Sequence, residues 1–218
     1  MPAEWEPQTA VQLTWPTRTS DWAPFLPRIE PVFHALVSCI SQHQRVIISC
    51  GSDQDASRLR HLYQNHAQVA IFRADNNDTW ARDHGPISVY RNGQLTLVDF
   101  LFNGWGGKYS HDKDNQISTT LQQLGAYGDT QLHAGSWILE GGSLETDGRG
   151  TLLTTENCLL NPNRNPSLTK GMIEARLAED LGIDRVLWLK HGHLEGDDTD
   201  AHIDTLARFC SPTSIAYC

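Results

Sequence analysis

Three predicted β-hairpins recur along this chain at a spacing of roughly 60 residues, which is the spacing expected of a repeated structural module. Each hairpin follows a polar residue that could take part in chemistry, namely Asp83, Glu140 and His202. A repeated hairpin, helix and strand indicates an α/β protein built from similar modules around or along an axis. The alternative is that ordinary α/β elements produce the same spacing by coincidence.

The hairpins are predicted from pairs of apolar-rich segments that flank turn residues. Asn-Gly and Asp-Gly between alternating apolar residues are strong signals for a tight turn. The predicted strand pairs are Ile87–Tyr90 with Leu95–Phe100, Ser143–Thr146 with Thr151–Thr155, and Ile203–Phe209 with Ile215–Tyr217.

Helix and strand patterns occupy the sequence between the hairpins. The segment from Ser167 to Leu181 has apolar residues near helical spacing, with Ser167 as a predicted N-cap and Gly182 as a stop signal. A shorter helix is predicted from Ser118 to Leu124, and a buried strand from Asp184 to Leu189. Upstream, a strand–helix–strand unit is predicted over Arg45–Ser49, Asp53–Gln64 and Val69–Phe72.

The segment that begins at Gly196 contains many groups whose removal from water costs much free energy. Asp198, Asp200, His202 and Asp204 occupy every second position. If this segment is extended, the alternate side chains share one face, and the carboxylates converge on the imidazole. Such a cluster suits either a metal ion or a positively charged substrate.

A second candidate segment runs from Asp78 to Pro86 and contains Trp80 and Asp83. An aromatic ring and a carboxylate at the entrance to a strand can hold a cation. The alternative is a structural pair between Arg82 and a carboxylate in a tight loop.

Two glycine-rich loops and a pair of histidines complete the candidates. Leu139–Ser143 contains Glu140 before two glycines, which permit a close backbone approach or form a bulge. Asn103–Tyr109 contains Trp105 but lacks the spacing of a phosphate-binding loop. His191 and His193 could bind zinc, manganese or iron together with the nearby aspartates, although a lone His-x-His is a weak signal.

The composition limits the classes of molecule that this protein is expected to bind. The 218-residue chain has a formal net charge of −9, which argues against nucleic acid and agrees with a small cationic substrate. No segment predicts a membrane span or a signal peptide. The five cysteines are scattered and lack a C-x-x-C motif, so we expect reduced thiols and a cytoplasmic setting.

Taken together, these segments resemble the agmatine deiminase family, which is similar to the bacterial-type peptidylarginine deiminases. The resemblance covers nearly the whole chain in the order of the family's motifs. The matching segments are Asp78–Pro86, Asn103–Tyr109, Leu139–Gly142, Leu159–Pro166 and Gly196–Phe209, with Met1–Pro7 and Leu13–Pro16 at the N-terminal end.

The resemblance implies a pentein-type α/β propeller, in which five ββαβ modules surround a pseudo-fivefold axis. With roughly 60 residues in each module, the chain would supply three to four modules. We therefore expect residues 1–218 to form a single domain, an incomplete deiminase propeller truncated at its C-terminal end.

The resemblance also implies a metal-free and cofactor-free reaction. A cysteine thiolate attacks the guanidinium carbon of agmatine, ammonia leaves, and water hydrolyses the covalent intermediate to N-carbamoylputrescine, a step in putrescine biosynthesis. His202 would be the general acid and base, and Asp83 and Asp204 would bind the guanidinium. Trp80 would border the substrate and Asp198 would lie in the same site. Further candidates without an assigned role are Glu140, Asp200 and Trp105.

One expected part is missing from the sequence. The family nucleophile lies in a Gly-rich segment with a His-Cys pair near the end of a longer chain, and no such segment occurs before Cys218. We therefore expect a truncated chain that is inactive by itself, and that associates with another chain or is marginally stable because a propeller edge is open. The alternatives are a protein-arginine deiminase, a metal-dependent hydrolase that uses His191, His193 and His202, and a non-catalytic module that binds guanidinium groups.

Overall fold

The structure is a computed structural model that describes residues 1–218, and the chain divides into two compact units. Unit 1 consists of Met1–Glu6, Arg82–Ser110 and Thr130–Cys218, and unit 2 consists of Pro7–Ala81 and His111–Asp129. Each unit is described by itself below. The expectation that residues 1–218 form a single domain stays a prediction.

Unit 2 is built on a parallel sheet of three strands in the order β1-β2-β3. Its strands are β1 (Ala10–Thr14), β2 (Arg45–Cys50) and β3 (Val69–Arg73), and its helices are α1 (Leu26–Ile40), α2 (Asp53–Leu62) and α5 (Ile117–Gln123). The predicted strand–helix–strand unit is confirmed. Ser52 caps α2 by accepting a hydrogen bond from the backbone N–H of Asp55.

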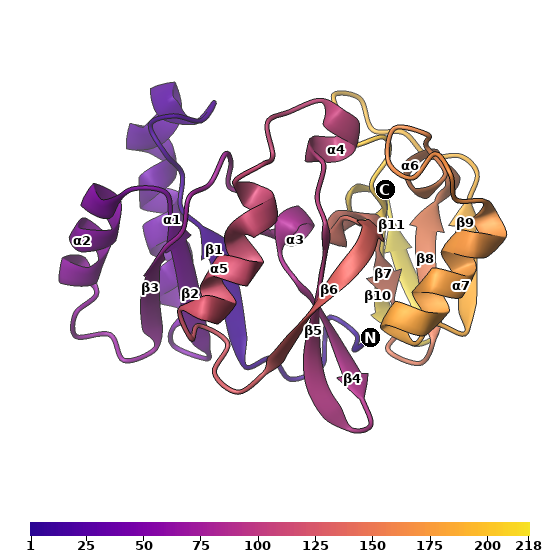
Figure 1. Ribbon diagram of the computed structural model, residues 1–218, viewed down its shortest axis with the longest axis horizontal. Coiled ribbons are helices and arrows are strands. Elements are labelled where there is room, and N and C mark those ends of the chain that lie inside the picture. Colours follow the sequence, from indigo (N-terminus) through magenta and orange to yellow (C-terminus); the bar gives the residue numbers. More distant parts are fainter. The chain divides into compact units, whose positions relative to one another are not determined.

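Strand β2 is buried on both of its faces. Ile48 packs in a cluster with residues of α1 and α2, whereas the adjacent Ile47 packs with Ile117 and Leu121 of α5. Helices therefore cover both faces of the sheet, as Figure 1 shows, with α1 and α2 on one side and α5 on the other. This explains why β2 reads as a continuous apolar run instead of an alternating pattern.

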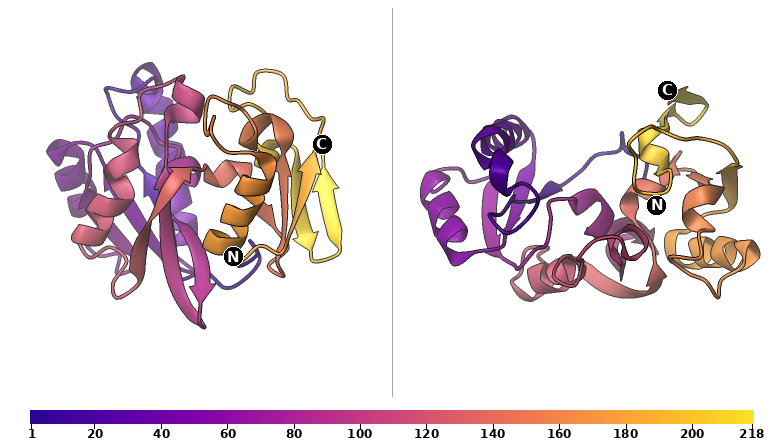
Figure 2. Two further views of the ribbon diagram at one scale, coloured as in Figure 1. Left: turned by 45° about the vertical axis from the view of Figure 1, so that its right-hand side comes forward. Right: turned by 90° about the horizontal axis from the view of Figure 1, so that it is seen from above.

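Unit 1 contains two sheets with the same topology. The first pairs β4 (Ile87–Arg91) antiparallel with β5 (Gln94–Leu101), and β5 parallel with β6 (Gln131–Ile138). The second pairs β7 (Glu145–Thr146) antiparallel with β8 (Thr151–Thr155), and β8 parallel with β9 (Arg185–Leu189). A third hairpin, β10 (Ala207–Ser211) with β11 (Ser214–Tyr217), is visible at the yellow end of the chain in Figure 2.

All three predicted hairpins are therefore confirmed, and the prediction of an α/β fold is confirmed with them. In the two three-stranded sheets of unit 1, the second strand of the hairpin pairs in parallel with a strand that arrives after a helix. The chain forms four sheets, and the fourth is the two-stranded β10–β11 hairpin. This arrangement is consistent with a propeller-type protein of which three to four modules are present.

The remaining helices of the chain are short except for α7 (Lys170–Leu181), which packs beside β8 and β9 (Figure 1). The short helices are α3 (Ala81–His84), α4 (Gly104–Gly107) and α6 (Glu156–Leu159). The N-cap of α7 is Thr169, so the prediction of Ser167 is wrong, because the Thr169 side chain accepts the N–H of Met172. Gly182 ends the helix in the left-handed region as predicted, with φ of 70°. None of the helices has the length and apolar character needed to cross a bilayer.

Candidate functional site

The residues that precede the three hairpins of unit 1 meet around Gly142. The backbone N–H of Gly142 donates to Asp83 Oδ1 at 2.9 Å. A Cβ atom at Gly142 would lie 2.5 Å from His202 Nδ1, 2.6 Å from Asp83 Oδ1 and 2.9 Å from Asp204 Oδ2. Only glycine leaves room for these three groups, so the Gly-Gly sequence serves a close approach and not merely a bulge.

Glu140 enters the cluster directly through His202. Glu140 Oε2 lies 2.7 Å from His202 Nε2, and His202 Nδ1 lies 3.6 Å from Asp83 Oδ1. Both Glu140 and His202 are almost fully buried. Burial alone would lower the pKa of His202, but the hydrogen bonds with Cys158 and Glu140 and the carboxylate of Asp83 raise it to about 11. His202 is therefore held as an imidazolium at neutral pH.

Asp83 is held in place by three separate groups. Trp105 Nε1–H donates to Asp83 Oδ2 at 3.0 Å, opposite the hydrogen bond from Gly142. Burial raises the pKa of Asp83, while the charge of His202 and the hydrogen bonds from Gly142 and Trp105 oppose that rise. Trp105 has a φ of 55°, and the side chain of Asn103 caps its turn by accepting the N–H of Gly106. The glycine-rich loop thus positions an indole donor, not a phosphate site.

Two buried residues that the sequence did not single out contact Glu140. Arg164 donates to both carboxylate oxygens of Glu140 through Nε at 3.1 Å, and through Nη2 to Oε2 at 3.0 Å. The Cys158 thiol lies 4.0 Å from Glu140 Oε2. The only sequence feature that pointed to Arg164 was its place among the Asn and Pro residues of Leu159–Pro166. That segment is equally typical of an ordinary turn-rich connection.

The run from Asp198 to Asp204 is not extended, so the prediction that its alternate side chains share one face is wrong. Asp200 and Ala201 have φ values of 66° and 68°, and Ile203–Thr205 forms a 3₁₀ turn. The physical reason is Asp197, whose carboxylate accepts the backbone N–H groups of Thr199 and Ala201 and closes a tight loop. The run separates into a buried part around His202 and a more exposed part.

Asp198 and Asp200 belong to the more exposed part. The exposed Asp198 carboxylate accepts a hydrogen bond from the Tyr109 hydroxyl. Asp200 accepts from Lys108 at 2.8 Å and from Arg164 at 2.5 Å. Burial favours the neutral form of Asp200, but these bonds and one from Asn163 together outweigh it and lower the pKa to about 2. Asp204 is half-buried, and no other residue engages its carboxylate in a hydrogen bond or ion pair.

Trp80 lies in unit 2, where it shares a carboxylate with a second indole. Trp80 Nε1–H donates to Asp78 Oδ2 at 3.1 Å, and Trp22 Nε1–H donates to Asp78 Oδ1 at 2.9 Å. Trp80 is 48% exposed, and its ring centroid lies 6.3 Å from that of Trp22. Arg82 of unit 1 makes a structural ion pair, as the alternative reading supposed, and its partner is Glu4 at 2.7 Å.

A metal site can be tested on the same cluster. The ligand atoms of Glu140, Cys158 and His202 lie within 4.8 Å of one another, which suits a small ion by distance alone. However, the Arg164 guanidinium already occupies the carboxylate of Glu140, and the raised pKa of His202 keeps a proton where a metal ligand needs a lone pair. His191 and His193 are exposed and are not part of this group. The donor set therefore fits a metal poorly.

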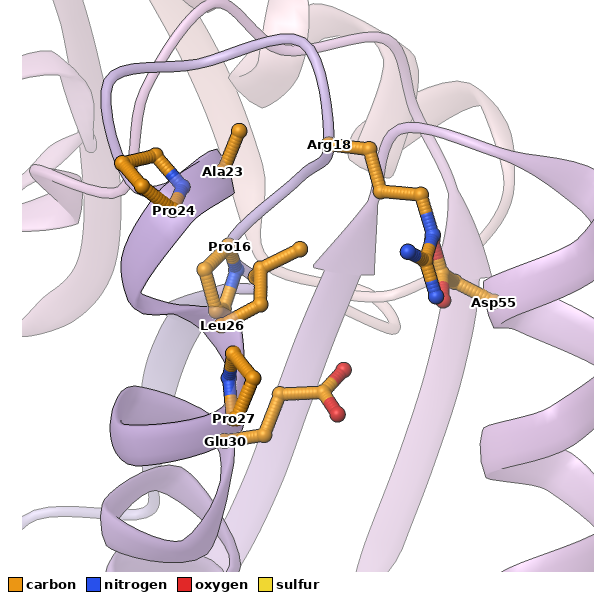
Figure 3. Close-up of a pocket in the computed structure, with 8 residues that line it drawn as sticks. All are labelled: Pro16, Arg18, Ala23, Pro24, Leu26, Pro27, Glu30 and Asp55. Atoms are coloured by element: carbon orange, nitrogen blue, oxygen red, sulfur yellow. The ribbon is translucent and has the colours of Figure 1, made fainter.

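Unit 2 has a pocket of its own, with a volume of about 250 Å³. Figure 3 shows the guanidinium of Arg18 directed toward Asp55, with Glu30 on the opposite wall. Both of these carboxylates are engaged by Arg58, at 3.0 Å for Asp55 and 2.5 Å for Glu30. None of the residues of the Gly142 cluster lines this pocket.

Comparison with known proteins identifies the family. The sequence profile of the Porphyromonas-type peptidyl-arginine deiminases matches residues 1–218. The agmatine deiminase of Stutzerimonas stutzeri is 36% identical over 221 residues, which cover 99% of this chain and 59% of that protein. The chain thus spans about three fifths of the length of this relative.

Solved structures agree with the sequence match. A substrate-bound form of the C. jejuni agmatine deiminase superposes with a TM-score of 0.91 at 38% identity, over 99% of this chain and 63% of that one. The agmatine deiminase of Enterococcus faecalis gives a TM-score of 0.87 at 33% identity, over 100% and 60%. The prediction from the sequence motifs is confirmed: this chain belongs to the Porphyromonas-type peptidyl-arginine deiminase family.

Proposed function

We propose that the cluster around Gly142 binds the guanidinium group of a small cationic substrate, and that the protein acts as a guanidine deiminase on agmatine. The products would be N-carbamoylputrescine and ammonia, which places the reaction in putrescine biosynthesis. The observation that carries the proposal is the convergence of Asp83, His202 and Asp204 within 3 Å of one point.

The chemistry of a guanidinium explains why these groups suit it. A guanidinium is planar, permanently charged and rich in N–H donors, so it is held best by carboxylates that accept from its edges. Asp83 and Asp204 would supply those carboxylates, and the Asp204 carboxylate has no partner within the chain. Trp80 and Asp198 stay proposed substrate-binding residues.

His202 would move the protons of the reaction. Its raised pKa keeps it charged, so it can donate a proton to the departing ammonia. Glu140, 2.7 Å from Nε2, would hold the ring so that Nδ1 faces the cluster. After a thiolate has attacked the guanidinium carbon and ammonia has left, the neutral ring could accept a proton from the water that hydrolyses the intermediate.

The proposal assigns no nucleophile within residues 1–218. Burial raises the pKa of the Cys158 thiol, and it raises the pKa of the Cys50 thiol to about 11. Both groups are therefore protonated thiols at neutral pH, unsuited to attack. Cys39, Cys210 and Cys218 are exposed and lie outside the Gly142 cluster.

Calorimetry can test the proposal on the 218-residue chain. We expect agmatine to bind and putrescine, which lacks the guanidinium, to bind at least ~10-fold more weakly. Calorimetry with a short peptide that contains one arginine decides whether agmatine or peptidyl-arginine is the preferred substrate. Asp83→Asn keeps the shape of the side chain but removes its charge. It should lower the affinity for agmatine by ~10-fold relative to the wild type.

The matched control is Asp114→Asn, which changes a buried carboxyl group of unit 2 and should leave agmatine binding unchanged. The absence of heat with millimolar agmatine would contradict the proposal. Release of ammonia from agmatine at the rate of a complete enzyme would contradict the assignment of no nucleophile within these residues.

A further inference from the structure

We infer that Arg164 is the positioning residue of the cluster: it holds Glu140 as a carboxylate against His202 and fixes the bent backbone from which His202 emerges. The catalytic meaning of this inference rests on the proposed function. Its structural content, that one buried guanidinium holds the carboxylate partner of His202 in place, stands without it.

The first half of the inference rests on the Arg164–Glu140 pair. Both side chains are 1% exposed, so neither charge is compensated by water. Three hydrogen bonds between 3.0 and 3.1 Å join the guanidinium to the two oxygens of Glu140. Oε2, the oxygen that meets Arg164 Nη2, is also the one that lies 2.7 Å from His202 Nε2. Arg164 and His202 therefore share one carboxylate oxygen.

The second half rests on the loop that precedes His202. Arg164 Nη1 donates to Asp200 Oδ2 at 2.5 Å, and Nη2 donates to the carbonyl oxygen of Thr199 at 2.7 Å. Asp200 and Ala201 occupy the left-handed region, which is unfavourable for residues with a side chain and persists only when the surroundings enforce it. The same guanidinium thus anchors both the partner of His202 and the backbone that leads into it.

The geometry of the guanidinium suits this double role. Nη1 also donates to the side-chain oxygen of Asn163 at 2.9 Å, so every N–H of Arg164 has an acceptor. A lysine ammonium carries the same charge on a single rotating group and cannot reach Glu140 and the Thr199 carbonyl in one plane. Arginine is therefore required by shape as well as by charge.

Two explanations predict opposite changes in the charge state of His202 when Arg164 is removed. A titration of His202 can therefore distinguish them. Loss of a nearby positive charge would by itself stabilise the imidazolium. On the positioning account, Glu140 without its cation partner turns away from His202, which loses a nearby anion that favours its charged form. The net effect is then the opposite of the simple charge effect.

The experiment is an NMR titration of the His202 ring in the 218-residue chain, without ligand. Wild type should stay an imidazolium from pH 6 to 9 and titrate only near pH 11, so the titration is carried beyond pH 11 to locate each midpoint. In Arg164→Gln the midpoint should fall by ~2 pH units or more, so that His202 titrates within this range. In Arg164→Lys the fall should be smaller, ~1 unit, because the charge stays but the fork is lost. The control is Arg82→Gln, which removes the same charge from an ion pair with Glu4 and should leave the His202 midpoint unchanged.

A folded Arg164→Gln chain in which His202 stays an imidazolium up to pH 9 would overturn the inference. If Arg164→Gln does not fold, Arg164→Lys decides in the same way, and an unchanged His202 midpoint in that variant overturns it. Because no turnover is measured, a failure here is distinct from a failure of agmatine binding. If both the proposed function and the positioning role of Arg164 are correct, Arg164→Gln also lowers the affinity for agmatine in calorimetry by ~10-fold. The reason is that the charge and position of His202 change together.

Discussion

The two units bury a carboxyl group in different ways. Glu140 in unit 1 and Asp114 in unit 2 are each 1% exposed. Glu140 is held by two cationic side chains, Arg164 and His202. Asp114 accepts backbone N–H groups from Asn77 at 2.7 Å and Asp78 at 3.1 Å, and burial raises its pKa to about 6 in spite of these bonds.

The difference indicates the structural role of each carboxyl group. A carboxylate that is held by backbone amides fixes a loop, and it can lose its charge near neutral pH without losing its place. A carboxylate between two side-chain cations fixes charges, and its removal leaves buried cations without a counter-ion. Substitutions in the two units can distinguish these two roles.

Glu140→Gln should be the most destabilising change. It leaves Arg164 buried without a full counter-charge, which typically costs ~3–5 kcal/mol of the free energy of unfolding. Asp114→Asn is the matched change in unit 2 and should cost only ~1 kcal/mol, because the amide oxygen can still accept from the backbone. Urea unfolding, followed by amide signals from each unit, measures both. Equal losses would remove the distinction between the two carboxyl groups.

Gly142→Ala should damage the cluster more than the fold. The new methyl group would lie within 3 Å of His202, Asp83 and Asp204, so these side chains must move apart. Overpacking of this kind costs ~1–3 kcal/mol, and we expect agmatine binding to be lost in calorimetry. Unchanged agmatine affinity in Gly142→Ala would show that the convergence around Gly142 is not the binding site.

Acidification should change the contributions of Asp114 in unit 2 and His84 in unit 1 with opposite signs. Asp114 has a folded pKa of about 6, above its ordinary 3.8, so its contribution to stability is complete below 3.8 and is lost as pH rises through 6. Burial lowers the pKa of His84 in unit 1 to about 4, so the unfolded chain binds the proton first and stability falls between pH 6.5 and 4.

From pH 7 to 4, these groups should therefore stabilise unit 2 and destabilise unit 1, each by ~1–3 kcal/mol. Segment-resolved urea unfolding at the two pH values checks this. In Asp114→Asn the stabilisation of unit 2 should vanish while the response of unit 1 remains. A response of unit 2 that is the same in Asp114→Asn as in the wild type would refute the assignment.

Gly171→Ala should give the smallest effect, and in the opposite direction. Gly171 lies inside α7, and a Cβ there would have no atom within 4 Å. Replacement should raise the free energy of unfolding by ~0.4–1 kcal/mol because the unfolded chain loses freedom. Thermal unfolding measures it, and a loss of stability would show that α7 cannot accept a methyl group at this position.

The sequence predicted those elements whose signals are local. Asn92 and Gly93 take positive φ values of 53° and 78°, which is the reason their dipeptide marks a hairpin. Helix α1 and strands β1 and β6 were not predicted, because packing in their unit, not a local turn or cap signal, determines them. Of the candidate residues, Asp83, Glu140, His202, Asp204 and Trp105 lie in the cluster, while Asp198 and Asp200 bind Tyr109, Lys108 and Arg164.

The bend at Asp200 was not predictable from the sequence because one of its two causes, the contact with Arg164, is distant. Arg164, 36 residues away along the chain, holds Asp200 in place, and no local pattern contains that contact. The alternation of Asp198 to Asp204 therefore resembled a strand although tertiary contacts impose a loop. The expected association with another chain stays a prediction, which sedimentation of the purified protein would check.

The most direct test of the proposed site is an NMR titration of the 218-residue chain with agmatine. The account predicts that the Gly142 amide and the His202 ring shift with a single saturation curve, and that putrescine at the same concentration does not reproduce it. Agmatine-dependent shifts confined to the pocket of Arg18, Glu30 and Asp55, with Gly142 and His202 unmoved, would contradict it.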